Sequence, residues 1–332
     1  MSSSLSYSLN GYHGIILPGP SVGLDVNGNV AKHIFISHAH ADHLPRDRNM
    51  HVYASAATEK LMRIRGFKGD VTTLAFNKPI ELDTCRVTLY PAGHILGSAM
   101  IGVECDEGHI LYSGDYRNPP SPVSEGFDCP DTVDYFITEA TFPLPIYKWK
   151  PHEELFRGIR DFALECLETD TTPVFLCYNL GKAQEVMHAL APLKKRVQIH
   201  GAGYKLSQVY SEMGYDLGVY ESYNKDTVQE GRILVTPSSS VEQPMVRNIR
   251  RKKLAYVSGW AAHESRRSQL TVDKLIPLSD HIDFFNLLDL CRKLNPKTVY
   301  LTHTPNPAVV QHYLEKEGIH ALPLNMEAHD EE

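Results

Sequence analysis

The feature that most restricts how this chain can fold is a group of ionisable side chains at the end of one short apolar run. The stretch HIFISHAHADHLPRD, residues 33–47, contains His38, His40, Asp42 and His43. Residues two apart in an extended segment point the same way, so His38 and His40 can reach one metal ion. After a turn, Asp42 and His43 can face a second ion. Imidazole suits zinc, and a carboxylate among imidazoles suits hydrolytic chemistry. A polar turn with surface histidines is the alternative interpretation.

The segments around this group predict a β-rich first part. Before residue 140 the chain shows short strand patterns separated by turn signals, namely GIILP, VGLDV, HIFISH, VYAS, VTTLAF, RVTLYPA, AMIGVEC, HILYSG and DYFITEA. Strands of this length and spacing favour a β-sandwich. The segment ATEKLMRIRGF has the pattern of a helix that ends near Gly66.

The strand-rich pattern ends at TFPLPIYKWKP, residues 141–151, which carries three prolines and is typical of a linker. HEELFRGIRDFALECLE follows with apolar residues at helical spacing. Strand and helix patterns then alternate, which predicts a parallel sheet covered by helices. From about residue 271 a short closing part contains the helix pattern FFNLLDLCRKL and the strand pattern TVYLTHT.

Length and composition limit the classes of protein to which the chain can belong. With 332 residues and 42% hydrophobic content, the chain can form one large domain or two modest ones. No apolar stretch approaches 18 residues and the start carries no signal-peptide pattern, so we expect no membrane association and a cytoplasmic location. Six scattered cysteines without a CxxC pair argue against a disulfide framework. The net charge of −7 does not indicate nucleic-acid binding, although the basic cluster at 247–253 can bind phosphate.

Several motifs together resemble the metallo-β-lactamase superfamily. HAHADH is similar to that superfamily's HxHxDH signature, and the remaining motifs follow in the expected order. Asp25 in VGLDV matches the first, His94 in PAGHILGSA the third and Asp115 in LYSGDY the fourth. The resemblance implies an αββα four-layer sandwich of the α/β class.

Three further motifs resemble the β-CASP nucleases within that superfamily. They are Glu139 in ITEAT, His281 in LSDHIDF and His303 in YLTHT. TEATFPLPIYKW and several later stretches are similar to the bacterial DNA-ligase-associated exonucleases, also described as messenger-RNA 3′-end-processing-factor-like. The resemblance implies a discontinuous catalytic domain, residues 1–148 and 271–332, with an inserted α/β β-CASP domain at 149–270. The segment VGLDVNGNVAKHIFISH is looser than that subgroup's usual one.

The resemblance also implies roles for the ionisable residues. His38, His40 and His94 would hold one divalent cation, Asp42, His43 and His303 the other, and Asp115 would bridge the two. Zinc is favoured by this ligand set, and manganese is the alternative. Two such cations activate a bridging hydroxide that attacks phosphorus in line.

Two residues are expected to support the chemistry beside the metals. His281 would give a proton to the leaving oxygen, and Glu139 would orient it. The alternative is that His281 is structural and the oxygen leaves on a metal. Asp25 would fix a ligand histidine from behind.

Substrate contacts rest on local patterns. Ser238 and Ser239 follow the strand pattern ILVTP, and Lys182 lies at a similar strand-to-helix junction, so all three are candidates to bind a terminal phosphate. Helix capping is the alternative. Arg266 and Arg267, with the 247–253 cluster, are candidates to line a nucleic-acid groove, and a solvated basic face is the alternative. Other histidines, among them His13 and His51, are interpreted as surface or structural.

These inferences predict a metal-dependent exonuclease acting on DNA in repair, with DNA preferred over RNA as its partner. The subgroup further implies a functional link to an ATP-dependent DNA ligase and a helicase. The alternatives are a ribonuclease of the same fold, a hydrolase of small esters or thioesters, and an inactive scaffold subunit. The filled ligand positions argue against the scaffold, and the inserted segment argues against the small-molecule hydrolase.

Overall fold

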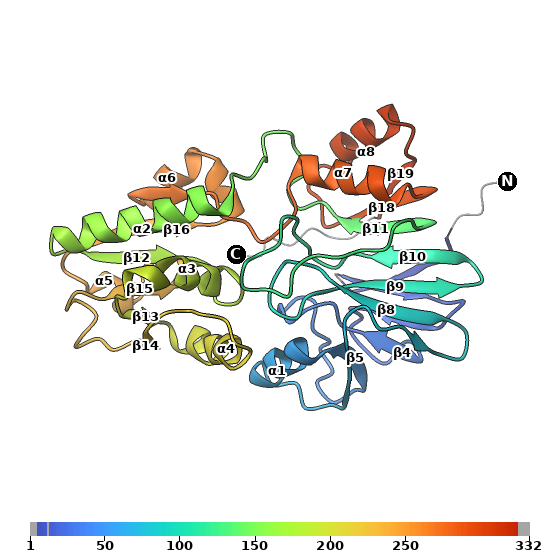
Figure 1. Cartoon of the computed structure of the whole chain (residues 1–332), viewed down its shortest axis with the longest axis horizontal. Coiled ribbons are helices and arrows are strands. Elements are labelled where there is room, and N and C mark those ends of the chain that lie inside the picture. The colour runs from blue at the N-terminus through green and yellow to red at the C-terminus, as the bar shows by residue number, and fades with distance from the viewer. Residues whose placement is uncertain (1–4, 12, 325–332) are drawn as a thin grey trace. The chain divides into compact units, whose positions relative to one another are not determined.

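The computed structural model describes residues 5–11 and 13–324 (Figure 1). The chain forms two compact units. The first combines the residues up to Lys148 with those from His281 onward, and the second runs from Trp149 to Asp280. Residues 271–280, expected from the sequence in the first unit, belong to the second. They include β17 (Lys274–Ile276), which pairs in parallel with β16 (Lys252–Val257) and so extends the sheet of the second unit.

The first unit contains two sheets. One consists of β1 (Ser8–Asn10), β2 (Gly14–Leu17), β3 (Val22–Leu24), β4 (His33–Phe35), β5 (Val52–Ser55) and β6 (Val71–Leu74), in this spatial order. The other has the spatial order β19-β18-β11-β10-β9-β8-β7. Its strands are β7 (Ile80–Glu81), β8 (Arg86–Pro91), β9 (Ala99–Cys105), β10 (Gly108–Tyr112), β11 (Tyr135–Glu139), β18 (Thr298–Thr302) and β19 (Ala321–Pro323).

The two sheets pack face to face, with helices outside. One core cluster joins side chains of both sheets, such as Leu24 and Phe35 with Leu89 and Ile101. A second cluster joins the outer face of the β18–β11 sheet to α7 (Phe284–Leu294) and α8 (Pro307–Lys316), which Figure 1 shows lying on that face. The helix α1 (Ala56–Ile64) follows β5 at the other sheet. The αββα sandwich expected from the sequence is therefore confirmed.

Local chemistry explains where these helices begin. The Ser55 hydroxyl accepts a hydrogen bond from the Thr58 amide, 3.1 Å away, and so caps α1. The Asp283 carboxylate accepts one from the Asn286 amide at 2.8 Å and caps α7. The buried residues of α7 recur at helical spacing, which turns one apolar face to the sheet.

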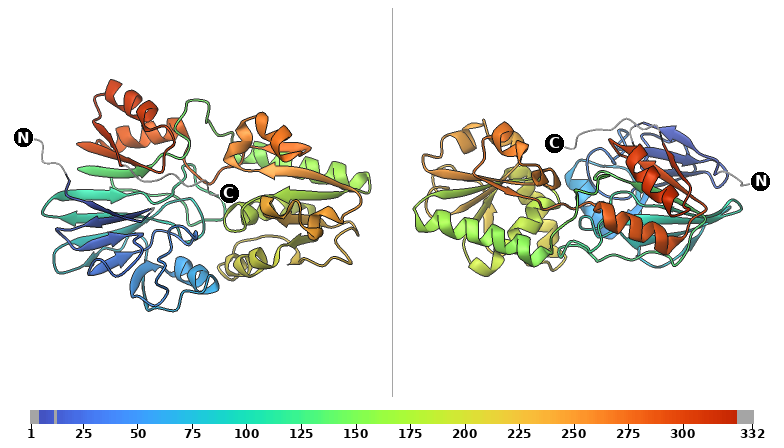
Figure 2. Two further views of the ribbon diagram at one scale, coloured as in Figure 1. Left: turned by 180° about the vertical axis from the view of Figure 1, so that it is seen from behind. Right: turned by 90° about the horizontal axis from the view of Figure 1, so that it is seen from above.

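The second unit is built on one parallel sheet of spatial order β14-β13-β15-β12-β16-β17. Its remaining strands are β12 (Thr172–Leu176), β13 (Val197–Ile199), β14 (Tyr220–Ser222) and β15 (Ile233–Thr236). Its helices are α2 (His152–Glu168), α3 (Lys182–Leu190), α4 (Gly201–Glu212), α5 (Pro244–Arg247) and α6 (Ser265–Leu270). Figure 2 shows α2, the long green helix, running alongside this sheet. The predicted parallel sheet covered by helices is confirmed, and the 141–151 stretch contains neither helix nor strand.

Strand direction brings several loops of the first unit to one edge. β10, β11 and β18 are mutually parallel, so their carboxyl ends meet. β8 is antiparallel to β9, which is antiparallel to β10, so β8 ends at the same edge. In the part of the chain that the structure describes, no helix is long and apolar enough to cross a membrane.

Candidate metal centre

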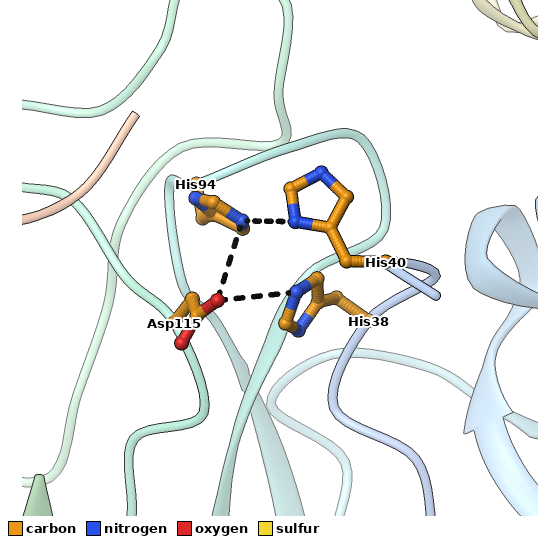
Figure 3. Close-up of side chains that lie close together, drawn as sticks. All are labelled: His38, His40, His94 and Asp115. Carbon is orange, nitrogen blue, oxygen red and sulfur yellow. Dashed lines mark hydrogen bonds and ion pairs between the residues drawn. The ribbon is translucent and has the colours of Figure 1, made fainter. Parts of the chain in front are cut away.

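Four side chains from three loops of the first unit converge (Figure 3). His38 and His40 follow β4, His94 follows β8, and Asp115 follows β10. His40 Nδ1 lies 3.1 Å from His94 Nε2, and Asp115 Oδ2 lies 3.4 Å from His38 Nε2 and 3.8 Å from His94 Nε2. All four residues are buried, and their ligand atoms lie within 4.8 Å of one another. This group has the donor types and the spacing to hold one metal ion.

A second group of converging ligand atoms consists of His13, Asp42 and His43. Asp42 Oδ2 is 3.1 Å from His13 Nε2 and 3.9 Å from His43 Nε2. His43 Nε2 is also 3.4 Å from Asp115 Oδ2, which places that carboxylate beside both groups. Among the described residues, His303 does not join a group of converging ligand atoms. Its Nε2 instead meets His13 Nδ1.

His13 is the site residue that sequence reasoning missed. It lies just before β2, far along the chain from the HxHxDH stretch, and no local spacing ties it to the other histidines. In the structure its side chain is 6% exposed and its ring stacks on that of His43, with the centroids 4.3 Å apart. A histidine in a glycine-flanked turn, as in GYHG, was the only available signal.

The buried polar atoms of these groups fit bound cations. The atoms His13 Nε2, His38 Nε2, His43 Nε2, Asp42 Oδ2 and Asp115 Oδ2 are buried without a hydrogen-bond partner. Burying so many polar atoms in one place is costly unless something satisfies them. Imidazole nitrogens and carboxylate oxygens that face one another are ligands of zinc and related divalent cations.

Hydrogen bonds behind the ligands fix which nitrogen faces the centre. Asp25 accepts bonds from the Ser37 amide at 2.7 Å, the Ser37 hydroxyl at 2.6 Å and the Tyr112 hydroxyl at 2.9 Å. Its Oδ2 also lies 2.8 Å from His43 Nδ1. Ser37 Oγ lies 2.9 Å from His38 Nδ1. Both rings thereby keep a proton on Nδ1 and turn Nε2 to the centre, the usual arrangement behind metal-binding histidines.

The charges of the site hold most of these groups in the protonation state that a metal ligand needs. Burial, with His43 nearby, lowers the pKa of His38 to about 4. Burial alone would raise the pKa of Asp115, but His43 and His38 hold it well below its usual value. Burial would lower the pKa of His43, but the charges of Asp115 and Asp42 raise it well above 6.5. Without cations, His43 is therefore protonated at neutral pH, so a cation that binds there displaces a proton.

The loop that carries His94 is fastened to the start of α1. The Gly97 carbonyl accepts hydrogen bonds from the Ser55 hydroxyl at 2.7 Å and the Thr58 hydroxyl at 2.8 Å. Gly97 has φ +81°, and a Cβ there would lie 2.5 Å from the Thr58 amide nitrogen. Glycine therefore lets this loop approach α1 closely and holds His94 in place.

Glu139 and His281 form a buried pair beside the first group. His281 Nδ1 lies 2.9 Å from Glu139 Oε1, and the His281 ring centroid lies 4.8 Å from that of His94. The Thr141 amide and hydroxyl donate to Glu139 Oε2 at 3.1 Å and 2.5 Å. The carboxylate is thus fixed on one side by backbone and hydroxyl groups and holds the imidazole on the other.

Three of the predicted substrate residues line one cavity of the second unit. Lys182, Ser238 and Ser239 surround a space of about 200 Å³ together with Cys177, Tyr178, Asn179, Pro237, Tyr256 and Val257. The cavity lies where β12, β15 and β16 end, at the carboxyl edge of the parallel sheet. Lys182 Nζ makes a 2.8 Å ion pair with Asp280. Ligands of parallel α/β sheets bind at this edge.

The predicted basic residues lie elsewhere in the second unit. Arg266 and Arg267 belong to α6 and do not line that cavity. The Arg266 guanidinium lies over the Trp260 ring, 6.0 Å from its centroid, and Arg267 pairs with Glu264 at 3.3 Å. Arg251 pairs with Asp170 at 3.2 Å. Arg251, Arg266 and Arg267 therefore each contact a neighbouring side chain.

Comparison with known proteins finds relatives named as a DNA ligase and as ribonucleases. No family model matches. A "Probable DNA ligase" of Opitutus terrae is 34% identical over 294 residues, which is 88% of this chain and 28% of that protein. "RNase aCSPSF2" of Saccharolobus solfataricus is 23% identical over 201 residues, 52% of this chain and 40% of the relative. An "RNase J-like protein" of Methanocaldococcus jannaschii is 27% identical over 176 residues, 46% of this chain and 42% of the relative.

The chain thus matches less than half the length of each of these curated relatives. A crystal structure of a protein of unknown function from Enterococcus faecalis is similar to this chain, with a TM-score of 0.60 and 17% identity. That match covers 90% of this chain and 81% of the other and supports the fold alone.

Proposed function

The chain belongs to the β-CASP group of the metallo-β-lactamase superfamily, and we propose that it is a two-metal exonuclease that hydrolyses phosphodiester bonds of DNA. One observation carries the proposal: buried, partner-less donor atoms from several loops converge around Asp115, with the Glu139–His281 pair beside them. A cytoplasmic location and a role in DNA repair complete the proposal.

The proposed ligands divide between two cations. His38, His40 and His94 hold the first, Asp42 and His43 belong to the second, and Asp115 is shared. The sequence also assigned His303 to the second cation. Zinc suits the imidazole-rich set, and manganese is the alternative. When bound, two divalent cations activate water at neutral pH and neutralise charge on the phosphate oxygens.

His281 is proposed to supply the proton that the leaving sugar oxygen needs. Glu139 contacts Nδ1 of the ring, so the transferable proton is the one on Nε2. Because Thr141 fixes the Glu139 carboxylate, the ring keeps its orientation during the reaction. Asp42 and Asp25 complete the machinery, Asp42 as a ligand and Asp25 by orienting His43.

The cavity of the second unit is proposed to bind a phosphate of the nucleic acid. Lys182 supplies positive charge, and the hydroxyls of Ser238 and Ser239 are donors to phosphate oxygens. Asn179 lines the same cavity, and its buried Oδ1 has no hydrogen-bond partner, so we propose it as an acceptor for a sugar hydroxyl or base. Arg266 and Arg267 are proposed as peripheral contacts to the backbone.

The preference for DNA is supported by the relative named as a DNA ligase, and a link to an ATP-dependent DNA ligase and a helicase is proposed with it. A ribonuclease is the second candidate, because the relatives named RNase share part of the chain. The two substrates differ at the 2′-hydroxyl, which a protein can read directly.

Matched DNA and RNA oligonucleotides of one sequence, labelled at either end, test the proposal. We expect stepwise shortening of the DNA with added zinc or manganese, and the labelled end shows the polarity. His38→Ala should abolish cleavage, whereas His51→Gln, a change at an exposed histidine, should not. Faster cleavage of RNA would favour the ribonuclease, and cleavage of neither substrate would contradict both.

A further inference from the structure

A second cavity of the second unit has no part in the reaction proposed above. Its volume is about 220 Å³, and it lies between the connection from β14 to β15 and the segment that contains α5. Tyr223 and Val228 line it from the first segment, and Met245 and Ile249 line it from the second. All four side chains belong to or pack against the apolar cluster of this unit, so the walls of the cavity are continuous with its core.

Hydrogen bonds hold the two lining segments together. The Tyr223 hydroxyl donates to the Met245 carbonyl at 3.4 Å, and the Arg250 amide donates to Gln229 Oε1 at 3.0 Å. The cavity is therefore formed before a ligand enters, which lowers the cost of ordering the site on binding.

The polar groups of the cavity suit a planar ligand with hydrogen-bonding edges. Because Gln229 Oε1 already accepts from the Arg250 amide, this side chain presents its Nε2 hydrogens as donors. The exposed amide of Asn248 supplies both a donor and an acceptor. Tyr223 adds an aromatic ring to the apolar walls. Apolar walls with a few polar groups are typical of sites that bind small ring systems.

Positive charge surrounds the cavity. Lys225 lines it, and Arg247 and Arg250 lie next to lining residues in the chain. All three are exposed, and within the described ranges no carboxylate forms an ion pair with any of them. Segments 223–229 and 244–250 contain these three cations and one acidic residue, Asp226. Cations beside an aromatic ring are the combination that single-stranded nucleic acid requires, because its phosphates repeat beside its bases.

We propose that this cavity binds a nucleobase of single-stranded nucleic acid, with the base stacked on the Tyr223 ring and Lys225 close to a neighbouring phosphate. The inference rests on the proposed nuclease function and gives the second unit a base-binding site. This site shares no lining residue with the cavity around Lys182. Every base has a π-face, so stacking tolerates different sequences.

Two single-stranded DNA oligonucleotides of equal length test the inference, one with normal bases and one made of abasic sites. Their affinities for the full chain are measured in chelator, where metal-dependent cleavage does not proceed. We expect wild type to bind the strand with bases more tightly. Tyr223→Leu should weaken binding of that strand by about 10-fold and leave the abasic strand unchanged. Tyr223→Phe keeps the ring without the bond to Met245 and should bind both strands as wild type does.

The role of Lys225 is tested by the salt dependence of binding. Lys225→Gln should weaken both strands and lower the slope of log affinity against log salt by about 0.7, the value for one phosphate contact on a single strand. Lys195→Gln, a change at an exposed lysine that does not line the cavity, is the control and should leave the slope unchanged. Equal slopes in the two variants would contradict the phosphate contact of Lys225.

The outcomes separate this inference from the function on which it rests. Equal affinity of wild type for the two strands, or a Tyr223→Leu variant that loses neither strand or both equally, would overturn the base-binding site. Metal-dependent cleavage by wild type would still support the nuclease, and its absence would contradict the nuclease whichever strand binds. If circular dichroism shows that Tyr223→Leu does not fold, Asn248→Ala replaces it, because this residue is exposed. The same selective loss is expected, and unchanged binding of both strands would overturn the inference.

Discussion

At the scale of single residues, Asp25 shows how a side chain that touches no cation can govern the centre. Its carboxylate accepts three hydrogen bonds and contacts His43 Nδ1 at 2.8 Å. We predict that Asp25→Asn lowers zinc affinity by about 10- to 100-fold, because an amide no longer fixes the His43 tautomer. Asparagine tolerates the φ of +49° at this position, so the backbone is kept.

The matched control for this change is Asp83→Asn, which alters an exposed ion pair with Lys32. Competition with a chelator measures both variants. Equal zinc affinity in Asp25→Asn and Asp83→Asn would show that the Asp25 carboxylate does not act on the centre.

His43 gives the metal-free protein a distinctive pH dependence. Its pKa in the folded state lies well above 6.5, so its contribution to stability is complete below pH 6.5 and is lost as pH rises through the raised pKa. Asp25 and Asp115 have lowered pKa values and titrate at acid pH, and His38, at about 4, also titrates below this window. We therefore predict that the urea midpoint measured in chelator falls as pH rises above 6.5.

His43→Gln should flatten this slope, because the variant has no ionisable group at that position. With saturating zinc the slope should vanish or reverse, since metal requires the neutral ring. A wild-type midpoint in chelator that is constant or rises across this range would contradict the assigned charge on His43.

The residue scale also shows what the sequence could and could not predict about the site. His38, His40, His94 and Asp115 were predicted because each belongs to a motif, and the structure brings their ligand atoms together. His13 has no motif. Its place follows from the packing of Gly14 in β2 against Val26 in the loop after β3, a contact that no local spacing shows.

At the scale of elements, the loop from β8 to β9 holds His94 through its contact with α1. We predict that Gly97→Ala destabilises the protein and lowers zinc occupancy, because the added Cβ meets the Thr58 amide nitrogen at 2.5 Å and displaces the loop. Gly66→Ala is a close control, since Gly66 has a similar φ of +84° but open space around it. It should cost only the backbone penalty of about 1–2 kcal/mol.

Urea denaturation and zinc content measure both variants. A loss of stability in Gly97→Ala no greater than that in Gly66→Ala, with full zinc content, would mean that the contact with α1 does not hold the His94 loop.

The elements themselves were predictable to different degrees. The apolar strands β9 and β11 and the amphipathic helices α2 and α7 carry clear periodic patterns over five or more residues. β1, β14, β17 and β19 are three residues long and partly exposed, so they carry too little pattern to predict. Their pairing depends on the neighbouring strand more than on their own sequence.

At the scale of the whole molecule, the chain forms two units with separate cores. All strands of the second unit's sheet lie in the chain from β12 to β17. Its apolar cluster consists of residues of that unit alone, for example Val174, Leu234 and Tyr256. We predict that residues 149–280 expressed alone unfold cooperatively in urea and bind no zinc. A non-cooperative transition would show that this unit needs the rest of the chain to fold.

We propose that the first unit assembles a two-cation centre that cleaves nucleic acid. The direct test measures the cleavage rate of an end-labelled oligonucleotide by metal-free protein as zinc or manganese is added in known equivalents. We expect no cleavage without metal, little at one equivalent and full activity at two. Full activity without metal or at one equivalent would contradict it.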